Sequence, residues 1–293
     1  MLDICCIGHI TLDKIITPSS TAYLNGGTSY YVAHALAQLP PLKFKLLTSL
    51  DKSQMPAVEA IRAKGIDVDV VPSRATVFFE NKYGHNFNNR KQRVLAKADP
   101  FTLDKVKDVE AKYIHLGSLL ADDFPLEVAQ HFAGKCILSV DAQGFLRYVD
   151  GENVIACDWD NKLEWLKIID IRKGNEHEGE ALTGHKDLRL AAKQLSDWGV
   201  KEVVITLGSY GSVVYCNGYY CEIPPFSPLV LADATGCGDT YMTGYLYKRA
   251  QGASIWEAGL FASAMSTIKL EHMGPFSGTE EDIMQLIEKN IKK

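Results

Sequence analysis

The sequence lacks the features that mark several large functional classes. No run approaches the ~20 consecutive apolar residues of a membrane helix, so we expect no membrane partner. Lys and Arg number 31 against 36 Asp and Glu, and the net charge of −5 leaves no basic excess for binding nucleic acid. Neither a membrane nor a nucleic acid is therefore expected as a partner of this chain.

Cysteine usage and the amino terminus add two more absences. The seven cysteines include no C-x-x-C pair, and their odd number fits reduced thiols better than a set of disulfides. The first residues have neither the basic segment nor the long apolar run of a signal peptide. We expect a cytoplasmic protein with free thiols.

What the chain does have is a hydrophobic content of 46% and, in its second half, apolar runs that alternate with helical ones. Each apolar run ends at Gly, Asp or Asn, or just beyond one of them. The runs cover residues 112–120, 135–144, 166–176 and 201–211. Continuous apolar strands between helices predict an α/β fold with a central, mostly parallel sheet flanked by helices. Ligands bind such sheets at the carboxyl ends of the strands.

We expect a single domain over residues 1–293, because no linker, repeat or low-complexity tract interrupts the chain. Residues 74–97 have two β-like runs around a polar centre, which predicts a hairpin that projects from the main body. The run 13–24 is broken by Pro18 and predicts an edge strand or a second hairpin. By shape alone, an ordinary surface hairpin is the favoured interpretation of residues 74–97.

The most informative stretch is Asp-Ala-Thr-Gly-Cys-Gly-Asp, residues 233–239, between an apolar run and a helical one. Its glycines let successive amide groups point the same way, and the helix that follows adds the positive end of its dipole, so the turn is suited to binding an anion. Tyr241 stands where the third glycine of a G-x-G-x-x-G fingerprint belongs, and no Walker A loop occurs.

Asp239 at the end of this turn would repel a bound phosphate. The conflict disappears if Asp239 takes a proton from a hydroxyl while the turn stabilises a phosphoryl group in transfer. A positioned base of this kind contributes about 10²–10⁴-fold to a rate. A lone Asp at a helix start is more simply a cap, but the flanking Gly-x-Gly and Asp233 favour the catalytic interpretation.

This stretch resembles the carboxy-terminal signature of the PfkB/ribokinase-like carbohydrate kinases, D-T-x-G-A-G-D-x-F-x-x-G. Both acids and the three glycines match, whereas Ala234, Cys237 and Tyr241 depart from the signature. The resemblance implies a ribokinase-like fold with a small β lid. It also implies transfer of the γ-phosphoryl group of ATP, with Mg²⁺, to a hydroxyl, and Asp239 as the catalytic base. It assigns the anion hole to the amides of Gly236, Cys237 and Gly238.

Other segments resemble the donor-binding parts of the same family. Asn175 and Glu178 match an N-x-x-E segment that helps place Mg²⁺ and phosphate, which assigns Asn175 to the nucleotide and Glu178 to Mg²⁺ through water. The same spacing is close to a capping box. Residues 203–215 resemble the nucleotide-binding strand and turn. That similarity assigns Thr206, Gly208 and Gly211 to the nucleotide.

The amino-terminal segments resemble the acceptor-binding parts. Asp13 is implied to hydrogen-bond the acceptor hydroxyls, and Gly26 and Gly27 to allow its close approach. The family commonly has Asn in G-G-x-x-x-N-x-A, but this chain has Tyr31 there. A phenol is bulkier than an amide and has one hydroxyl in place of a donor–acceptor pair. We therefore expect an acceptor other than ribose or fructose, such as a cyclitol.

Several expectations remain open at this point. Asp233 and Thr235 match positions at which some relatives bind a monovalent cation, which leaves activation by K⁺ undecided. The segments 13–24 and 74–97 would form the lid, and the composition does not choose between a monomer and a homodimer formed through lids. The favoured function is a sugar or polyol kinase. The alternatives are a kinase of a nucleoside or vitamin-like alcohol, and a catalytically weak regulator that binds sugar or nucleotide.

Overall fold

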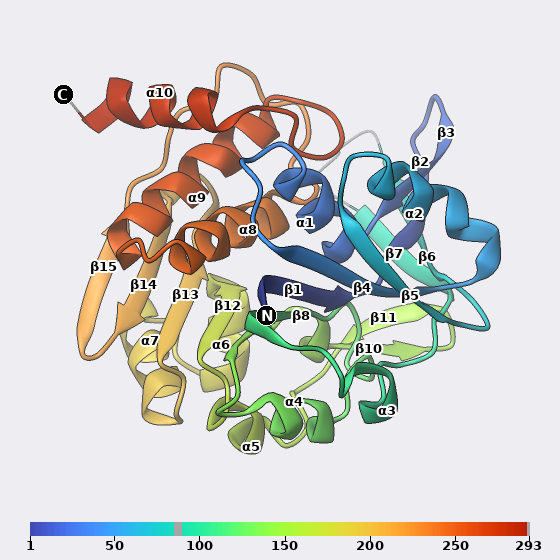
Figure 1. Cartoon of the computed structure of the whole chain (residues 1–293), viewed down its shortest axis with the longest axis horizontal. Helices are drawn as coiled ribbons and strands as arrows, with labels where there is room; N and C mark the ends of the chain where they lie inside the picture. The colour runs from blue at the N-terminus through green and yellow to red at the C-terminus, as the bar shows by residue number, and fades with distance from the viewer. Residues whose placement is uncertain (85–89, 292–293) are drawn as a thin grey trace.

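The computed structural model describes residues 1–84 and 90–291. These residues form a nine-stranded main sheet with helices on both faces and a six-stranded second sheet at one side (Figure 1). Residues 85–89, at the centre of the hairpin expected over 74–97, lie outside the described part of the chain.

The main sheet has the strand order β15-β14-β13-β12-β9-β8-β1-β4-β5. From β13 to β5 each strand runs parallel to its neighbours, and β14 and β15 add an antiparallel edge. The prediction of a mostly parallel central sheet is confirmed. The strands are β1 (Leu2–Gly8), β4 (Phe44–Leu50), β5 (Asp67–Pro72), β8 (Ala111–Gly117), β9 (Ile137–Asp141), β12 (Ile171–Asn175), β13 (Glu202–Thr206), β14 (Ser212–Cys216) and β15 (Tyr219–Ile223).

Both faces of this sheet are covered, which explains its continuous apolar strands. In β1, Ile4 and Cys6 belong to one hydrophobic core and Cys5 and Ile7 to another, because neighbouring side chains point to opposite faces. The first core includes α1 (Thr28–Leu36), α2 (Met55–Arg62), α8 (Cys237–Ala250), α9 (Ile255–Leu270) and α10 (Glu280–Ile291). The second includes α3 (Leu103–Val106), α4 (Leu126–Phe132), α5 (Lys162–Leu166), α6 (Glu176–Thr183) and α7 (Leu188–Asp197).

The second sheet has the order β10-β11-β7-β6-β2-β3. Four of its strands come from the two segments expected to form a lid: β2 (Thr11–Ile16), β3 (Thr21–Gly26), β6 (Val77–Tyr83) and β7 (Arg90–Ala96). The remaining two, β10 (Arg147–Asp150) and β11 (Asn153–Ala156), were not foreseen. They have four residues each and are mostly exposed, so they are too short for their hydrophobic pattern to be recognised in the sequence.

The sequence predicted free thiols and no membrane-spanning segment, and the structure bears on both predictions. All seven cysteines lie among the described residues and carry free thiols. Burial raises the pKa of Cys5 to about 12, which keeps that thiol protonated. Within residues 1–84 and 90–291, no helix combines the length and apolar character needed to cross a bilayer.

Candidate active site

The residues singled out in the sequence gather around the first turn of α8, at the carboxyl edge of the main sheet. Gly236 precedes this helix with a φ of 75°, a left-handed conformation that favours glycine. A Cβ on Gly236 would lie only 2.3–2.5 Å from ring carbons of Tyr31. Both the backbone conformation and the packing therefore require glycine at this position.

The expected anion hole is only partly free in this structure. The amide of Cys237 donates to the carbonyl of Ala234 at 3.2 Å. The early amides of a helix have no partner within the helix, which leaves the Gly238 amide suited to an anion. Burial raises the pKa of the Cys237 thiol, so the thiol stays protonated.

Asp239 lies in the first turn of α8, and its environment suits a general base. Burial raises its pKa from 3.8 to about 6, and Asp141 adds to the rise. Lys173 and a hydrogen bond from the Thr28 side chain oppose that rise. A carboxylate with this pKa is largely ionised at pH 7 yet basic enough to take a proton from a hydroxyl.

Lys173 and Asp141 form a buried ion pair in this site that the sequence did not indicate. The Lys173 Nζ donates to Asp141 Oδ2 at 2.7 Å, and both side chains are less than one-tenth exposed. A Cβ on Gly238 would lie 2.8 Å from Lys173 Nζ. The ammonium group therefore sits directly against the first turn of α8. It adds a full positive charge to the helix end at which an anion is expected.

The expected acceptor residues lie on β2, at the end of β3 and on α1, and we call them the acceptor wall: Asp13, Gly26, Gly27 and Tyr31. Asp13 Oδ2 would lie 2.6 Å from a Cβ on Gly26, and Asp13 Oδ1 accepts a hydrogen bond from the Thr11 hydroxyl at 2.7 Å. Tyr31 is buried, and its pKa is raised by burial and by the charges of Asp233, Asp239 and Asp13. The Tyr31 side chain thus faces the site.

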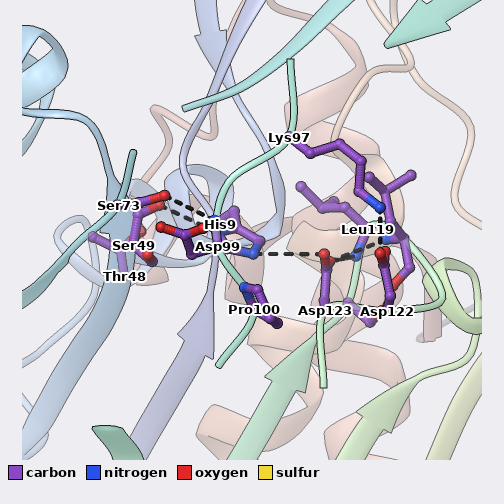
Figure 2. A network of polar contacts seen from close by, with 12 residues as sticks. His9, Thr48, Ser49, Ser73, Lys97, Asp99, Pro100, Leu119, Asp122 and Asp123 are labelled. Carbon is purple, nitrogen blue, oxygen red and sulfur yellow. Dashed lines mark hydrogen bonds and ion pairs between the residues drawn. The ribbon is translucent and has the colours of Figure 1, made fainter. Parts of the chain in front are cut away.

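Figure 2 shows a network of polar contacts around His9, whose backbone packs against Gly27 of the acceptor wall. His9 follows β1, and its Nδ1 lies 3.1 Å from the carbonyl oxygen of Ser49 at the end of β4. On its other side, His9 Nε2 lies 3.5 Å from Asp123 Oδ1, and Asp123 Oδ2 accepts from the amide of Leu119. A Cβ atom on Gly27 would lie only 2.5 Å from the carbonyl oxygen of His9, so the two backbone segments pack directly against each other. The network therefore holds the backbone against which Gly27 packs.

Three of the four expected nucleotide residues share one cavity with the start of α8, whereas Asn175 does not line it. The cavity has a volume of about 460 Å³ and is lined by Thr206, Gly208, Gly211, Cys237 and Gly238. Apolar side chains such as Phe226 and Leu231 line it as well. A cavity that joins an apolar wall to a helix amino terminus can hold a base together with a phosphate chain.

Asn175 and Glu178 form a full capping box at the start of α6, as one alternative from the sequence predicted. The Asn175 side chain accepts from the Glu178 amide at 2.8 Å, and Glu178 Oε2 accepts from the Asn175 amide at 2.8 Å. The Arg172 side chain lies close to the Glu178 carboxylate, on the same side of Gly174. A Cβ atom on Gly174 would be 2.5 Å from Arg172 Nη2 and 2.7 Å from Glu178 Oε2. The guanidinium of Arg172 is fully buried and has no hydrogen-bond partner in the described part of the chain.

Glu178 fits the metal role that the resemblance implies for it. Mg²⁺ in kinases is typically held by one or two carboxylates together with the substrate phosphates, so one acid suffices. No group of three or more His, Cys, Asp or Glu within residues 1–84 and 90–291 could hold a metal by itself. A bound Mg²⁺ would therefore depend on phosphate oxygens for part of its ligand set.

Asp233 and Thr235 lie just before α8, at the expected position for a monovalent cation. Asp233 Oδ1 accepts from the Thr235 amide at 2.9 Å. The Nζ of Lys269, from the last turn of α9, donates to the Asp233 carbonyl at 2.7 Å and lies 3.2 Å from Asp233 Oδ2. Burial would raise the pKa of Asp233, but the hydrogen bonds from Thr235 and the charge of Lys269 lower it overall. Lys269 was not foreseen from the sequence.

This fold and this site define a kinase of small molecules, and comparison with known proteins agrees. The model of the pfkB family carbohydrate kinases matches residues 1–282 of this chain. The chain therefore belongs to the pfkB family of carbohydrate kinases. As a member, it is a kinase that transfers a phosphoryl group to a hydroxyl of a small molecule.

Two curated relatives are similar along nearly their whole length. A nucleoside kinase of Methanothermobacter thermautotrophicus is 32% identical, with 93% of this chain and 90% of the relative covered. A cytidine kinase of Thermococcus kodakarensis is 26% identical, with 88% and 92% covered. Among solved structures, a pyrophosphate-dependent kinase of the ribokinase family, in complex with a pyrophosphate analog and myo-inositol, has a TM-score of 0.84 at 28% identity. That match covers 96% of this chain and 99% of the other.

Proposed function

We propose that this kinase phosphorylates a hydroxyl of a small cyclic polyol, such as a cyclitol, with ATP as the donor and Asp239 as the base. The observation that carries the proposal is the position of Asp239. It lies one residue after Gly238, which lines the donor cavity, and three residues after Gly236, which packs against Tyr31 of the acceptor wall. A base at this junction can reach a hydroxyl that faces the donor phosphate.

In the proposed reaction the acceptor oxygen bonds to the γ-phosphorus while its proton passes to Asp239. The bond from that phosphorus to the bridging oxygen breaks and releases ADP. Lys173 and the Gly238 amide would face the charge on the transferred group, and Asp141 would hold the Lys173 ammonium in place. Mg²⁺, held through water by Glu178, would neutralise charge on the donor phosphates.

Tyr31 is the reason to propose a cyclic polyol. Its ring packs against Gly236, so the phenol occupies space at the start of the helix that carries Asp239. A small, flat ring that bears several hydroxyls suits such a pocket, and Asp13 could accept hydrogen bonds from them. The similar structure that was solved with myo-inositol supports this class of acceptor.

Two other interpretations are weaker but specific enough to test. The nucleoside and cytidine kinases among the relatives favour a nucleoside as acceptor, and the pyrophosphate-dependent kinase favours pyrophosphate as donor. We keep ATP because pyrophosphate alone needs no cavity with apolar walls such as Phe226 and Leu231. A regulator that only binds is disfavoured, because it has no use for a buried acid with a raised pKa such as Asp239.

The test is product formation, followed by ³¹P NMR and mass spectrometry, with ATP or pyrophosphate as donor. The acceptors would be cyclitols, hexoses, pentoses and nucleosides. We expect a phosphorylated cyclitol from ATP and a loss of about 10²–10⁴-fold in Asp239→Asn. Asp67→Asn removes the same charge from an exposed residue of β5 and should be fully active. A nucleoside monophosphate as the main product would refute the acceptor class.

Tyr31 provides a second test of acceptor choice. Tyr31→Asn restores the family residue and enlarges the pocket, so we expect the ratio of kcat/KM for cyclitol over pentose to fall. Tyr31→Phe keeps the ring and removes only the hydroxyl, and it should preserve the cyclitol preference. Unchanged ratios in both variants would show that Tyr31 does not select the acceptor.

A further inference from the structure

The contacts of Asp233 bear on whether this kinase needs a monovalent cation. Lys269 is fully buried, and its Nζ contacts both the carbonyl oxygen and the Oδ2 of Asp233, at 2.7 and 3.2 Å. These are oxygen atoms of a residue that matches a cation-binding position of the family. In this chain a side-chain ammonium from α9 already binds them.

The remaining contacts of the Asp233 carboxylate also come from hydrogen-bond donors. The Thr235 amide donates to Oδ1 at 2.9 Å, and the Gly274 amide donates to Oδ2 at 3.2 Å. Buried ionised groups are stable when they are paired and hydrogen-bonded in this way. The cluster is therefore complete in charge and in hydrogen bonds without a metal ion.

A metal cation and the Lys269 ammonium cannot use the same oxygen atoms at once. Two unit positive charges at such a short distance repel each other strongly inside a protein, where water screens them little. Since Lys269 is covalently attached and fully buried, it does not exchange with ions in solution. Binding of K⁺ at Asp233 would require Lys269 to leave its position.

We propose that the Lys269 ammonium replaces the monovalent cation, so that phosphoryl transfer by this chain proceeds without K⁺. Lys269 is then a positioning residue. By holding Asp233 it holds the turn 233–236, which sets the direction of the first amides of α8. The rate effect of Lys269 rests on the proposed function, whereas its effect on the structure of the turn does not.

The first experiment replaces tetramethylammonium chloride with KCl at constant ionic strength and measures the rate of phosphoryl transfer. We expect no change for the wild type. Lys269→Ala opens the position, and we expect a loss on the order of 10²-fold in kcat, as for misplaced reacting groups. KCl or methylammonium should restore part of that loss. Activation of the wild type by KCl, or a Lys269→Ala variant without a cation response, would overturn the proposal.

A second measurement needs no turnover and separates this proposal from the proposed function. The Tm of the wild type should be equal in the two salts, whereas the Tm of Lys269→Ala should be lower and should rise in KCl. Lys193→Ala deletes an exposed lysine of α7 and controls for charge; its Tm should not respond to KCl. If no acceptor is phosphorylated but the Tm values behave as expected, only the proposed function fails. A wild-type Tm that KCl raises would refute the replacement by Lys269.

Discussion

Acidification from pH 7 to pH 5 should lower kcat/KM about tenfold, because Asp239 must be ionised to accept a proton. With a pKa of about 6, Asp239 is about nine-tenths ionised at pH 7 and about one-tenth ionised at pH 5. An aspartate with the ordinary pKa of 3.8 would remain mostly ionised at pH 5 and would show almost no loss. The size of the loss therefore reports the burial of this one carboxyl group.

The assay is kcat/KM for the phosphorylated acceptor from pH 4.5 to pH 8.5, with circular dichroism at each pH to confirm that the chain stays folded. The donor phosphates also titrate in this range. In Asp239→Asn the donor phosphates still titrate, but the carboxylate at position 239 is absent. The ratio of wild-type to variant kcat/KM at each pH therefore reports the titration of Asp239 alone. If this ratio is flat between pH 7 and pH 5, then Asp239 is not the base or is not buried as described.

The same pKa makes a prediction about stability, with the opposite sign to activity. Because the pKa of Asp239 is higher in the folded protein than the ordinary 3.8, ionisation destabilises the fold. The cost is absent well below pH 4 and complete above about pH 6, where it reaches at most about 3 kcal/mol. Asp239→Asn should therefore be more stable than the wild type at pH 8. The gain in Tm should disappear as the pH is lowered towards 4.

Two further predictions concern the first turn of α8. Gly236→Ala adds strain at a φ of 75° and a clash with Tyr31, so we expect a loss of about 2–4 kcal/mol in urea unfolding. Gly252 has a similar φ, but a Cβ there would meet open space, so Gly252→Ala should lower the free energy of unfolding by only about 1–2 kcal/mol. Equal losses in the two variants would show that the clash with Tyr31 contributes nothing. Lys173→Met removes a cation that lowers the pKa of Asp239, so the acid limb of the rate profile should move to higher pH. If the acid limb of the pH–rate profile does not move in Lys173→Met, then Lys173 does not influence the pKa of Asp239.

The sequence by itself indicated the main sheet and the start of α8, and it singled out Asp239 as the candidate base. Continuous apolar strands are buried on both faces, so their composition is enough to indicate a parallel sheet. The stretch 233–239 specifies its own local shape, because Gly236 must adopt a left-handed conformation and the helix begins directly after it. The capping box of Asn175 and Glu178 is equally local. Short-range rules of this kind need no knowledge of the rest of the chain.

Only the tertiary structure decided which distant residues complete the site. Lys173 meets Asp141 from 32 positions away, and Lys269 meets Asp233 from 36 positions away. Neither lysine is part of a spacing pattern, because an ion pair depends on distance in space and not on separation along the chain. The orientation of Tyr31 over Gly236 and the pairing of β10 and β11 with the second sheet follow the same rule. Contacts between elements are set when the sheet and helices pack. That packing brings Lys173, Lys269 and Tyr31 to the end of the helix that carries Asp239.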